Sequence, residues 1–178
     1  MSKLLVLNGS PRKKGNSSIL SEYLISNLSN DYQSEQLFLY DYPINPCMDC
    51  RACKIDELEC ILDDGMTEIY QKLDQADVLI FGSPIYWFGP TGQTKLLVDR
   101  FRPYFVNKKL KGKKAAIILP AGTGSADCDL TTEMFKRTFD ALDIEFLGVV
   151  TSKSYDVGDA YNDKEALQNV ELLAQKLK

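Results

Sequence analysis

The sequence contains no histidine among its 178 residues. This absence excludes Ser-His-Asp and Cys-His catalysis, zinc or haem ligation by imidazole, and an imidazole proton shuttle. Any chemistry must therefore use carboxylates, thiols, hydroxyls, backbone groups or a bound cofactor. The chain also has no apolar run near the ~20 residues that a membrane-spanning helix needs, and the run at 4–7 is too short for a signal-peptide core. We therefore expect a cytoplasmic protein with no membrane partner.

Positive charge is also scarce. Against 25 Asp and Glu the chain has 21 Lys and Arg, a net charge of −4. Nucleic acids and anionic membrane surfaces bind spread positive charge, so we expect no nucleic-acid partner. The apolar fraction of 44% is ordinary for a folded protein, and the length suits one compact domain. The sequence therefore predicts a single domain over residues 1–178.

Apolar runs predict five strands, at 3–7, 34–40, 78–81, 115–119 and 144–150. Apolar residues at helical spacing predict helices at 16–28, 64–73, 91–101, 130–142 and 166–177. Most of the strands are continuously apolar, which is typical of parallel strands buried on both faces. Five such strands joined by helical crossovers predict a doubly wound α/β domain. Ligands in such domains bind beyond the carboxyl ends of the strands.

The loop after the first strand, residues 8–18, combines phosphate-binding components. It leads into a helix, whose first N–H groups are free, and it carries three hydroxyls and the fixed charge of Arg12. Five residues separate Gly9 from Gly15, where a P-loop needs four, and the dinucleotide fingerprint G-x-G-x-x-G is missing. The loop therefore predicts a phosphate site of another kind.

Three consecutive aromatic residues, Tyr86, Trp87 and Phe88, follow the third strand between Pro84 and Pro90. Three large rings between two prolines cannot all point into one core, so we expect at least one to be exposed. Exposed aromatic surface at this edge of a sheet is typical of contact with a flat ligand or with a second subunit. Together with the phosphate site, it predicts a site for flavin mononucleotide (FMN).

Three motifs carry a family resemblance: Ser10-Pro-Arg-x-x-Gly-Asn-Ser, Gly82-Ser-Pro-Ile-Tyr-Trp and Thr94-Lys-x-x-x-Asp99-Arg100. In this order they resemble the NADPH-dependent FMN reductase group of flavodoxin-like proteins, most closely its iron–sulfur flavoprotein-like branch. The resemblance covers nearly the whole chain. It implies a flavodoxin-like five-stranded parallel sheet in the order 2-1-3-4-5, with helices on both faces.

The same resemblance implies FMN contacts from three loops. The phosphate would be held by Ser10, Arg12, Asn16, Ser17 and Ser18. The isoalloxazine ring would be lined by Pro84, Ile85, Tyr86, Trp87 and Phe88. Backbone groups would complete the edge of the ring at Ala121, Gly122, Thr123 and Gly124. The family also implies a homodimer or homotetramer.

A loop insertion at about 41–62 contains four of the five cysteines, spaced Cys47-x2-Cys50-x2-Cys53-x6-Cys60. This spacing allows the four sulfurs to converge on one centre. It resembles the compact motif that carries a [4Fe-4S] cluster in iron–sulfur flavoproteins, and it departs from the bacterial ferredoxin run. Zinc bound by four thiolates and free thiols without metal remain open alternatives. We expect the fifth, Cys128, to be a packing residue.

In this interpretation the flavin carries the chemistry, and no side chain is assigned as catalytic. NAD(P)H would reduce bound FMN, which would then reduce a small acceptor such as a quinone, a free flavin, an azo or nitro compound, or a metal ion. One alternative is a non-enzymatic electron carrier between protein partners. Another is a module in which FMN is structural and the aromatic loop binds a partner.

Overall fold

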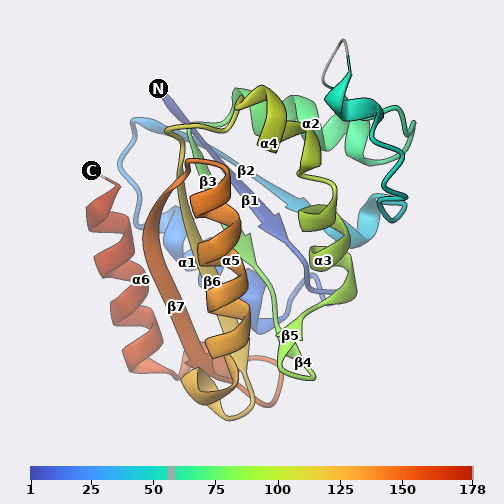
Figure 1. The fold of residues 1–178 in the computed structure, drawn as a ribbon. Helices are drawn as coiled ribbons and strands as arrows, with labels where there is room; N and C mark the ends of the chain where they lie inside the picture. The colour runs from blue at the N-terminus through green and yellow to red at the C-terminus, as the bar shows by residue number, and fades with distance from the viewer. Residues whose placement is uncertain (56–58, 178) are drawn as a thin grey trace.

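The computed structural model describes residues 1–55 and 59–177. Its main sheet has five parallel strands in the order β2-β1-β3-β6-β7 (Figure 1). The strands are β1 Ser2–Asn8, β2 Tyr32–Phe38, β3 Val78–Gly82, β6 Lys114–Ala121 and β7 Glu145–Lys153. Counted along the chain this is the order 2-1-3-4-5, so the predicted flavodoxin-like topology is confirmed.

Helices cover both faces of the sheet. The longer helices are α1 Asn16–Ser26, α2 Met66–Gln75, α3 Gly92–Asp99, α4 Arg102–Asn107, α5 Asp129–Ala141 and α6 Lys164–Lys176. Buried residues of α1 and α6 pack together on one face of the sheet, and those of α2, α3, α4 and α5 pack on the other. None of the helices in the described ranges is long and apolar enough to cross a membrane.

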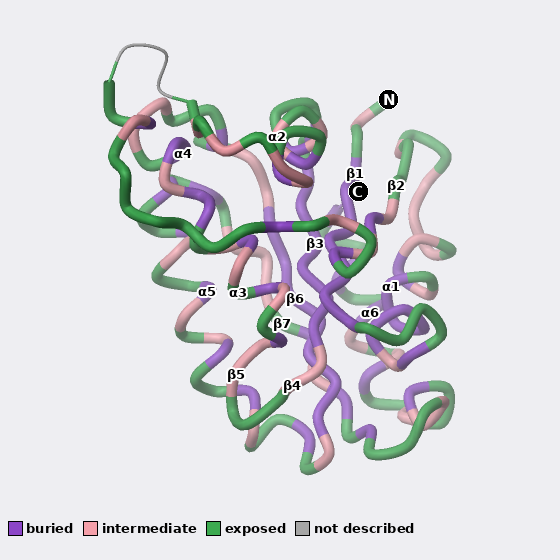
Figure 2. The backbone as a smooth tube through the Cα atoms, turned by 90° about the vertical axis from the view of Figure 1, so that its right-hand side faces the viewer, coloured by how far each residue is buried: buried purple, intermediate pink, exposed green. Residues whose placement is uncertain are grey.

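Strand β3 illustrates why the central strands are continuously apolar. Leu79 and Phe81 belong to the core cluster on one face, whereas Val78 and Ile80 belong to the cluster on the other. All five residues of β3 are buried, and Figure 2 shows the central strands as the buried interior of the molecule. Because helices cover both faces of the sheet, no side chain of this strand reaches solvent, and the strand is apolar at every position rather than at alternate ones.

The edge strand β2 corrects the prediction of a strand at 34–40. It begins at Tyr32 and ends at Phe38, and Leu39–Asp41 form a 3₁₀ turn, η1. Its extent is set by its partner, because β2 pairs with β1 residue for residue over the full length of both strands. Strand β2 lies at the edge of the sheet, and most of its residues are polar and incompletely buried, so its bounds are hard to predict from the sequence.

The predicted helix at 91–101 is also shorter in the structure. It ends at Asp99, and a second helix, α4, follows directly with Pro103 in its first turn. Proline cannot donate a backbone hydrogen bond and its ring clashes with the carbonyl four residues earlier, so it ends one helix and starts another.

The remaining short elements lie in the connections. A two-stranded antiparallel hairpin, β4 Ile85–Tyr86 and β5 Gly89–Pro90, was not predicted. Further 3₁₀ turns in the described residues are η2 Ala52–Lys54, η3 Gly124–Asp127 and η4 Asp159–Tyr161.

Candidate functional site

A pocket of about 230 Å³ lies at the carboxyl ends of the central strands. Four loops contribute to its wall: those after β1, β3, β6 and β7. The lining residues are Ser10, Arg12, Gly15, Asn16, Ser17, Pro84, Ile85, Tyr86, Pro120, Ala121, Gly122, Ser154, Tyr155 and Val157. The strand order reverses between β1 and β3, so the pocket occupies the position at which doubly wound sheets bind ligands.

The loop after β1 is held in shape by its own hydrogen bonds. Asn8 Oδ1 accepts from the N–H of Ser10 at 2.9 Å, and Asn8 Nδ2 donates to Ser18 Oγ at 3.0 Å. The N–H of Arg12 donates to Ser10 Oγ at 3.1 Å, and that of Gly15 to the carbonyl of Arg12 at 2.9 Å. A Cβ on Gly15 would lie 3.0 Å from that carbonyl oxygen, so the turn has almost no room for a side chain.

Free hydrogen-bond donors gather where this loop enters α1. Ser17 Oγ is buried and has no hydrogen-bond partner within the described ranges. The backbone N–H groups of residues 16–18 also have no hydrogen-bond partner within the described ranges, because the hydrogen bonds of α1 begin with Ile19 donating to Gly15. The first turn contains no acidic residue, and Arg12 is exposed beside it. Amide donors, a hydroxyl and a guanidinium at a helix N-terminus fit the phosphate of FMN.

Asn16, predicted as a phosphate ligand, uses its side chain elsewhere. Its Oδ1 accepts from the N–H groups of Gly158 and Ala160 at 3.0 and 3.3 Å, and its Nδ2 donates to the carbonyl of Asp156 at 2.9 Å. These partners belong to the loop after β7. The free backbone N–H of Asn16 still lies at the start of α1, and a phosphate contact of this residue stays a prediction.

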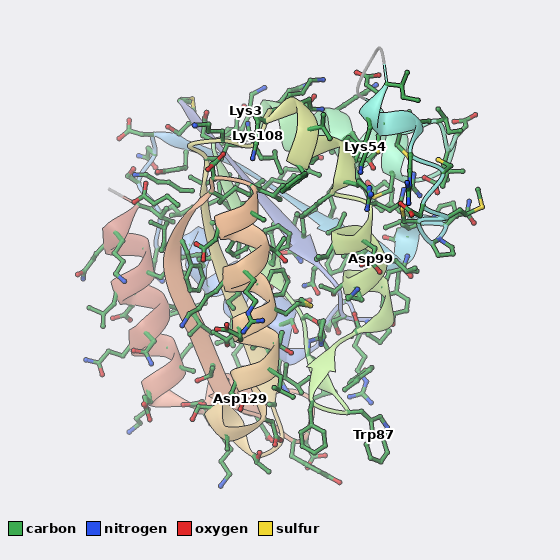
Figure 3. All side chains as sticks on the ribbon, in the orientation of Figure 1. Lys3, Lys54, Trp87, Asp99, Lys108 and Asp129 are labelled. Carbon is green, nitrogen blue, oxygen red and sulfur yellow. The ribbon has the colours of Figure 1, made fainter. Side chains whose placement is uncertain are left out.

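The aromatic residues after β3 form the tip of the β4–β5 hairpin. Trp87 and Phe88 are its two turn residues, with φ angles of 51° and 65°. Two-residue turns of this kind favour asparagine and glycine, because left-handed backbone is strained for bulky side chains. Trp87 is 94% exposed and points away from the fold (Figure 3). The expected exposure of an aromatic ring is therefore confirmed.

The predicted contacts of this loop divide into two groups. Pro84, Ile85 and Tyr86 line the pocket, whereas Trp87 and Phe88 do not line it in this chain. Any contact of the two tip residues with a flavin ring stays a prediction.

The loops after β1 and β3 are tied together by buried hydroxyl groups. Thr91 Oγ1 donates to the carbonyl of Gly9 at 2.6 Å, and the N–H of Thr91 donates to Ser83 Oγ at 3.0 Å. A Cβ on Gly9 would lie 1.8 Å from Thr94 Oγ1, so only glycine allows α3 to approach this closely. Thr91 therefore joins the loop after β1 (the phosphate loop) to the loop after β3 (the aromatic loop), with the motif residues Ser83 and Thr94 as its hydrogen-bond partners.

The loop after β6 supplies only part of its predicted set. Ala121 and Gly122 line the pocket, whereas Thr123 and Gly124 do not. Gly124 is buried and lies against Lys153. Three pocket residues that follow β7 were not predicted from the sequence: Ser154, Tyr155 and Val157. Their position after a predicted strand could have indicated them, because β7 is parallel to β6 and ends beside it.

The four clustered cysteines line a second, much smaller cavity of about 20 Å³, together with Arg100 and Arg102. The thiols are Cys47 and Cys50, which are exposed, Cys53, which is buried, and Cys60, which is half-buried. Burial and the nearby Cys60 raise the pKa of Cys53. Within the described ranges no three metal-ligating side chains converge closely enough to hold an ion. The thiols thus share a cavity, and metal ligation by them stays a prediction.

A buried ion pair between Arg100 and Asp64 fastens both ends of the cysteine loop, the segment between Asn45 and Asp64. Arg100 Nη1 lies 2.6 Å from Asp64 Oδ2, and the two side chains are 1% and 3% exposed. Arg100 also donates to the carbonyl of Asn45 at 2.8 Å and to Cys60 Sγ at 3.3 Å. Burial alone would raise the pKa of Asp64, but hydrogen bonds from Arg100 and from the N–H groups of Asn45 and Met66 hold it below its ordinary value.

Cys128 lies apart from this cluster and is 1% exposed in the core, as expected for a packing residue. Burial raises its pKa to about 11. The pocket and the cysteine cavity share no lining residue. In Figure 3, Lys54 marks the cysteine loop and Trp87 the hairpin beside the pocket, with Asp99 at the end of α3 between them.

Comparison with known proteins places this site in a family. The model of the family described as NADPH-dependent FMN reductase matches residues 2–154. A putative NAD(P)H-dependent FMN-containing oxidoreductase of Bacillus subtilis is 30% identical over 182 residues, which cover 98% of this chain and 97% of that protein. An iron–sulfur flavoprotein of Methanosarcina thermophila is also 30% identical, over 98% of this chain and 93% of its own length.

The fold is also found in a solved NAD(P)H:quinone oxidoreductase from Methanothermobacter marburgensis. Its TM-score is 0.70 at 19% identity, over 99% of this chain and 96% of the other. The family match spans most of the chain and includes all three loops that were assigned to FMN from the sequence. This protein is an oxidoreductase and belongs to the NADPH-dependent FMN reductase family.

Proposed function

We propose that this protein transfers electrons from NAD(P)H, by way of FMN held in the four-loop pocket, to a small acceptor. The acceptor classes are a quinone, a free flavin, an azo or nitro compound, or a metal ion. The observation that carries the proposal is the set of unpaired donors at the start of α1, above all the buried Ser17 Oγ within the pocket wall. Buried polar groups without a partner are rare, and a phosphate acceptor would satisfy this one.

Each part of the pocket has its own role in binding. Ser17 Oγ, the first N–H groups of α1, the Arg12 guanidinium and Ser10 would hold the phosphate. Ser18, also predicted as a phosphate ligand, does not line the pocket and accepts a hydrogen bond from Asn8 that keeps the loop in shape. Pro84, Ile85 and Tyr86 would bind one part of the ring system, and Ala121 and Gly122 another. When bound, FMN supplies the hydride and electron transfer, and the chain supplies binding and orientation.

The exposed hairpin tip supports association of the chain with itself. Trp87 and Phe88 present large apolar surfaces next to the pocket without covering it. Exposed aromatic surface of this kind is typical of protein contacts. We propose a homodimer or homotetramer in which the tip lies at a subunit contact.

The test is FMN binding by Ser17→Ala, with Ser21→Ala as the matched control. Ser21 lies one turn further along α1, and its buried Oγ also has no partner within the described ranges, but it does not line the pocket. A hydrogen bond to a charged phosphate predicts about tenfold weaker binding or more for Ser17→Ala. Ser21→Ala should bind FMN like the parent chain. Failure of the parent chain to bind FMN would refute the proposal.

A second candidate function is that of an iron–sulfur flavoprotein that carries single electrons between protein partners. It is favoured by the four thiols around one cavity, with Arg100 and Arg102 placed to offset thiolate charge. Cys47, Cys50, Cys53 and Cys60 would be the ligands of a [4Fe-4S] cluster. Relatives named iron–sulfur flavoprotein support it.

Two measurements separate the candidates. Steady-state NAD(P)H oxidation with a quinone acceptor identifies an enzyme, whereas a carrier turns over only with its partner. Iron, sulfide and zinc analysis of anaerobically purified protein decides among a cluster, a zinc site and free thiols. Cys53→Ser should lose any bound metal, and Cys128→Ala should keep it, because Cys128 lies in the core away from the cavity.

A further inference from the structure

The side chain of Asn16 fastens the start of α1 to a loop more than 130 residues away. All three of its hydrogen bonds go to backbone groups of the loop after β7: the N–H of Gly158, the N–H of Ala160 and the carbonyl of Asp156. These bonds use both the amide oxygen and the amide nitrogen. The Asn16 side chain therefore has both its oxygen and its nitrogen engaged within the chain.

The fastened loop is also closed by bonds of its own. Asp159 Oδ2 accepts from the N–H groups of Tyr155 and Asp156 at 3.0 and 2.8 Å. Gly158 has a φ angle of 99°, in the left-handed region that favours glycine. The N–H of Ser154 continues the sheet by donating to the carbonyl of Ala121. The loop is therefore ordered on both sides of Tyr155.

This order places an exposed aromatic ring in the pocket wall. Tyr155 is 84% exposed, yet a Cβ on Gly122 would lie 3.2 Å from its Cδ2 atom. The ring thus lies directly over Gly122. Because β3 and β7 are the two neighbours of β6, the loops that carry Tyr86 and Tyr155 flank the loop that carries Gly122.

We propose that Tyr155 is a flavin-contacting residue and that Asn16 is its positioning residue, acting through the loop after β7. The proposal rests on the proposed binding of FMN in this pocket. A flat aromatic ligand between two tyrosine-bearing loops would cover surface of Tyr155 that the chain itself leaves open. The side chain of Asn16 would then serve FMN binding through its three hydrogen bonds to the loop after β7 rather than through a contact with the phosphate.

The experiment is a double-mutant cycle on FMN affinity, measured by flavin fluorescence during titration of the apoprotein. Loss of one aromatic contact predicts about three- to tenfold weaker binding for Tyr155→Ala. Tyr155→Phe should bind like the parent chain, since the ring makes the contact. Asn16→Ala should weaken binding by no more than Tyr155→Ala does, and the double variant should bind within about twofold of Tyr155→Ala.

Gly122→Ala perturbs the ring of Tyr155 while leaving Asn16 and its hydrogen bonds unchanged. The added methyl group would lie 3.2 Å from Tyr155 Cδ2 and would shift this ring slightly, so the part of its effect that passes through Tyr155 should be absent in the Tyr155→Ala background. Ser17→Ala is the control for additivity: it acts on the phosphate, so its effect should multiply with that of Tyr155→Ala. Faster hydrogen exchange at the N–H groups of Gly158 and Ala160 in Asn16→Ala would report the released loop directly.

Three results would overturn the proposal. One is unchanged affinity of Tyr155→Ala for FMN. Another is a multiplicative effect of Asn16→Ala and Tyr155→Ala, which would mean that Asn16 acts on the ligand by a separate route. The third is unchanged hydrogen exchange at Gly158 and Ala160 in Asn16→Ala. Each of these leaves the proposed function intact, whereas a parent chain that binds no FMN refutes the proposed function itself.

Discussion

Replacing Arg100 by methionine tests how the cysteine loop is held. The substitution keeps much of the side-chain length but removes the charge and its hydrogen bonds. It leaves Asp64, which is 3% exposed, without its cationic partner, and leaves the carbonyl of Asn45 without the donor that it has in the structure. We expect a large loss of folding free energy.

The magnitude follows from burial. Removing one partner of a buried ion pair costs about 3–5 kcal/mol, because the other charge stays in a poorly solvated place. The N–H groups of Asn45 and Met66 still donate to Asp64 in the variant, which favours the lower end, about 3 kcal/mol. At roughly 2–4 °C per kcal/mol for a chain of this size, the melting temperature should fall by about 6–12 °C.

Urea unfolding of the FMN-free protein measures this loss, and Lys95→Met supplies the matched control. Lys95 pairs with Asp99 on the surface of α3, where both side chains are about half exposed. Exposed pairs four residues apart in a helix contribute only about 0.3–0.5 kcal/mol. If Arg100→Met lost no more stability than Lys95→Met, the assignment of Arg100 as the anchor of the loop would be wrong.

Three further predictions concern stability. Gly9→Ala should destabilise the fold and weaken FMN binding, because its methyl group would lie 1.8 Å from a hydroxyl oxygen on α3, whereas Gly92→Ala, with no atom within 4 Å, should not; melting curves compare them. The pKa of Asp64 is lowered from 3.8 in the folded state, so its contribution is complete above that pH and is lost as the pH falls through the lowered value. Asp64→Asn should therefore flatten the dependence of unfolding free energy on pH below about 4. Replacing Trp87 by Asn and Phe88 by Gly relieves two left-handed positions and should raise the unfolding free energy in urea by about 1–2 kcal/mol.

The fold could be predicted from the strands that are buried on both faces of the sheet. Strands β1, β3 and β6 lie in the middle of the sheet, so their continuous apolar runs identify them. Strand β2 lies at the edge of the sheet and exposes polar residues such as Glu35. It has no continuous apolar run to mark its ends, so its predicted bounds were displaced by two residues. Helix α4 was not predicted, because it lies beyond the predicted helix at 91–101 and its six residues are too few to show an apolar period.

The site could be predicted where a loop follows a well-marked strand. The phosphate loop and the aromatic loop both do, and most of their assigned residues line the pocket. The loop after β7 could not be assigned, because Ser154, Tyr155 and Val157 match no motif. The use of the Asn16 side chain was equally invisible, since its partner in space, Gly158, is 142 residues away in the chain.

Helix α3 explains the role of the Thr94-to-Arg100 motif, of which only Arg100 lines either the pocket or the cavity of the cysteines. At its start, Thr91 and Thr94 hold the phosphate and aromatic loops together. Just after its end, Arg100 holds the cysteine loop. Eight residues of helix span about 12 Å, so one rigid element sets the distance between the two regions. The Thr94-to-Arg100 motif therefore links the two sites: Thr94 lies against Gly9 in the loop after β1, and Arg100 lines the cavity of the cysteines and donates to Cys60.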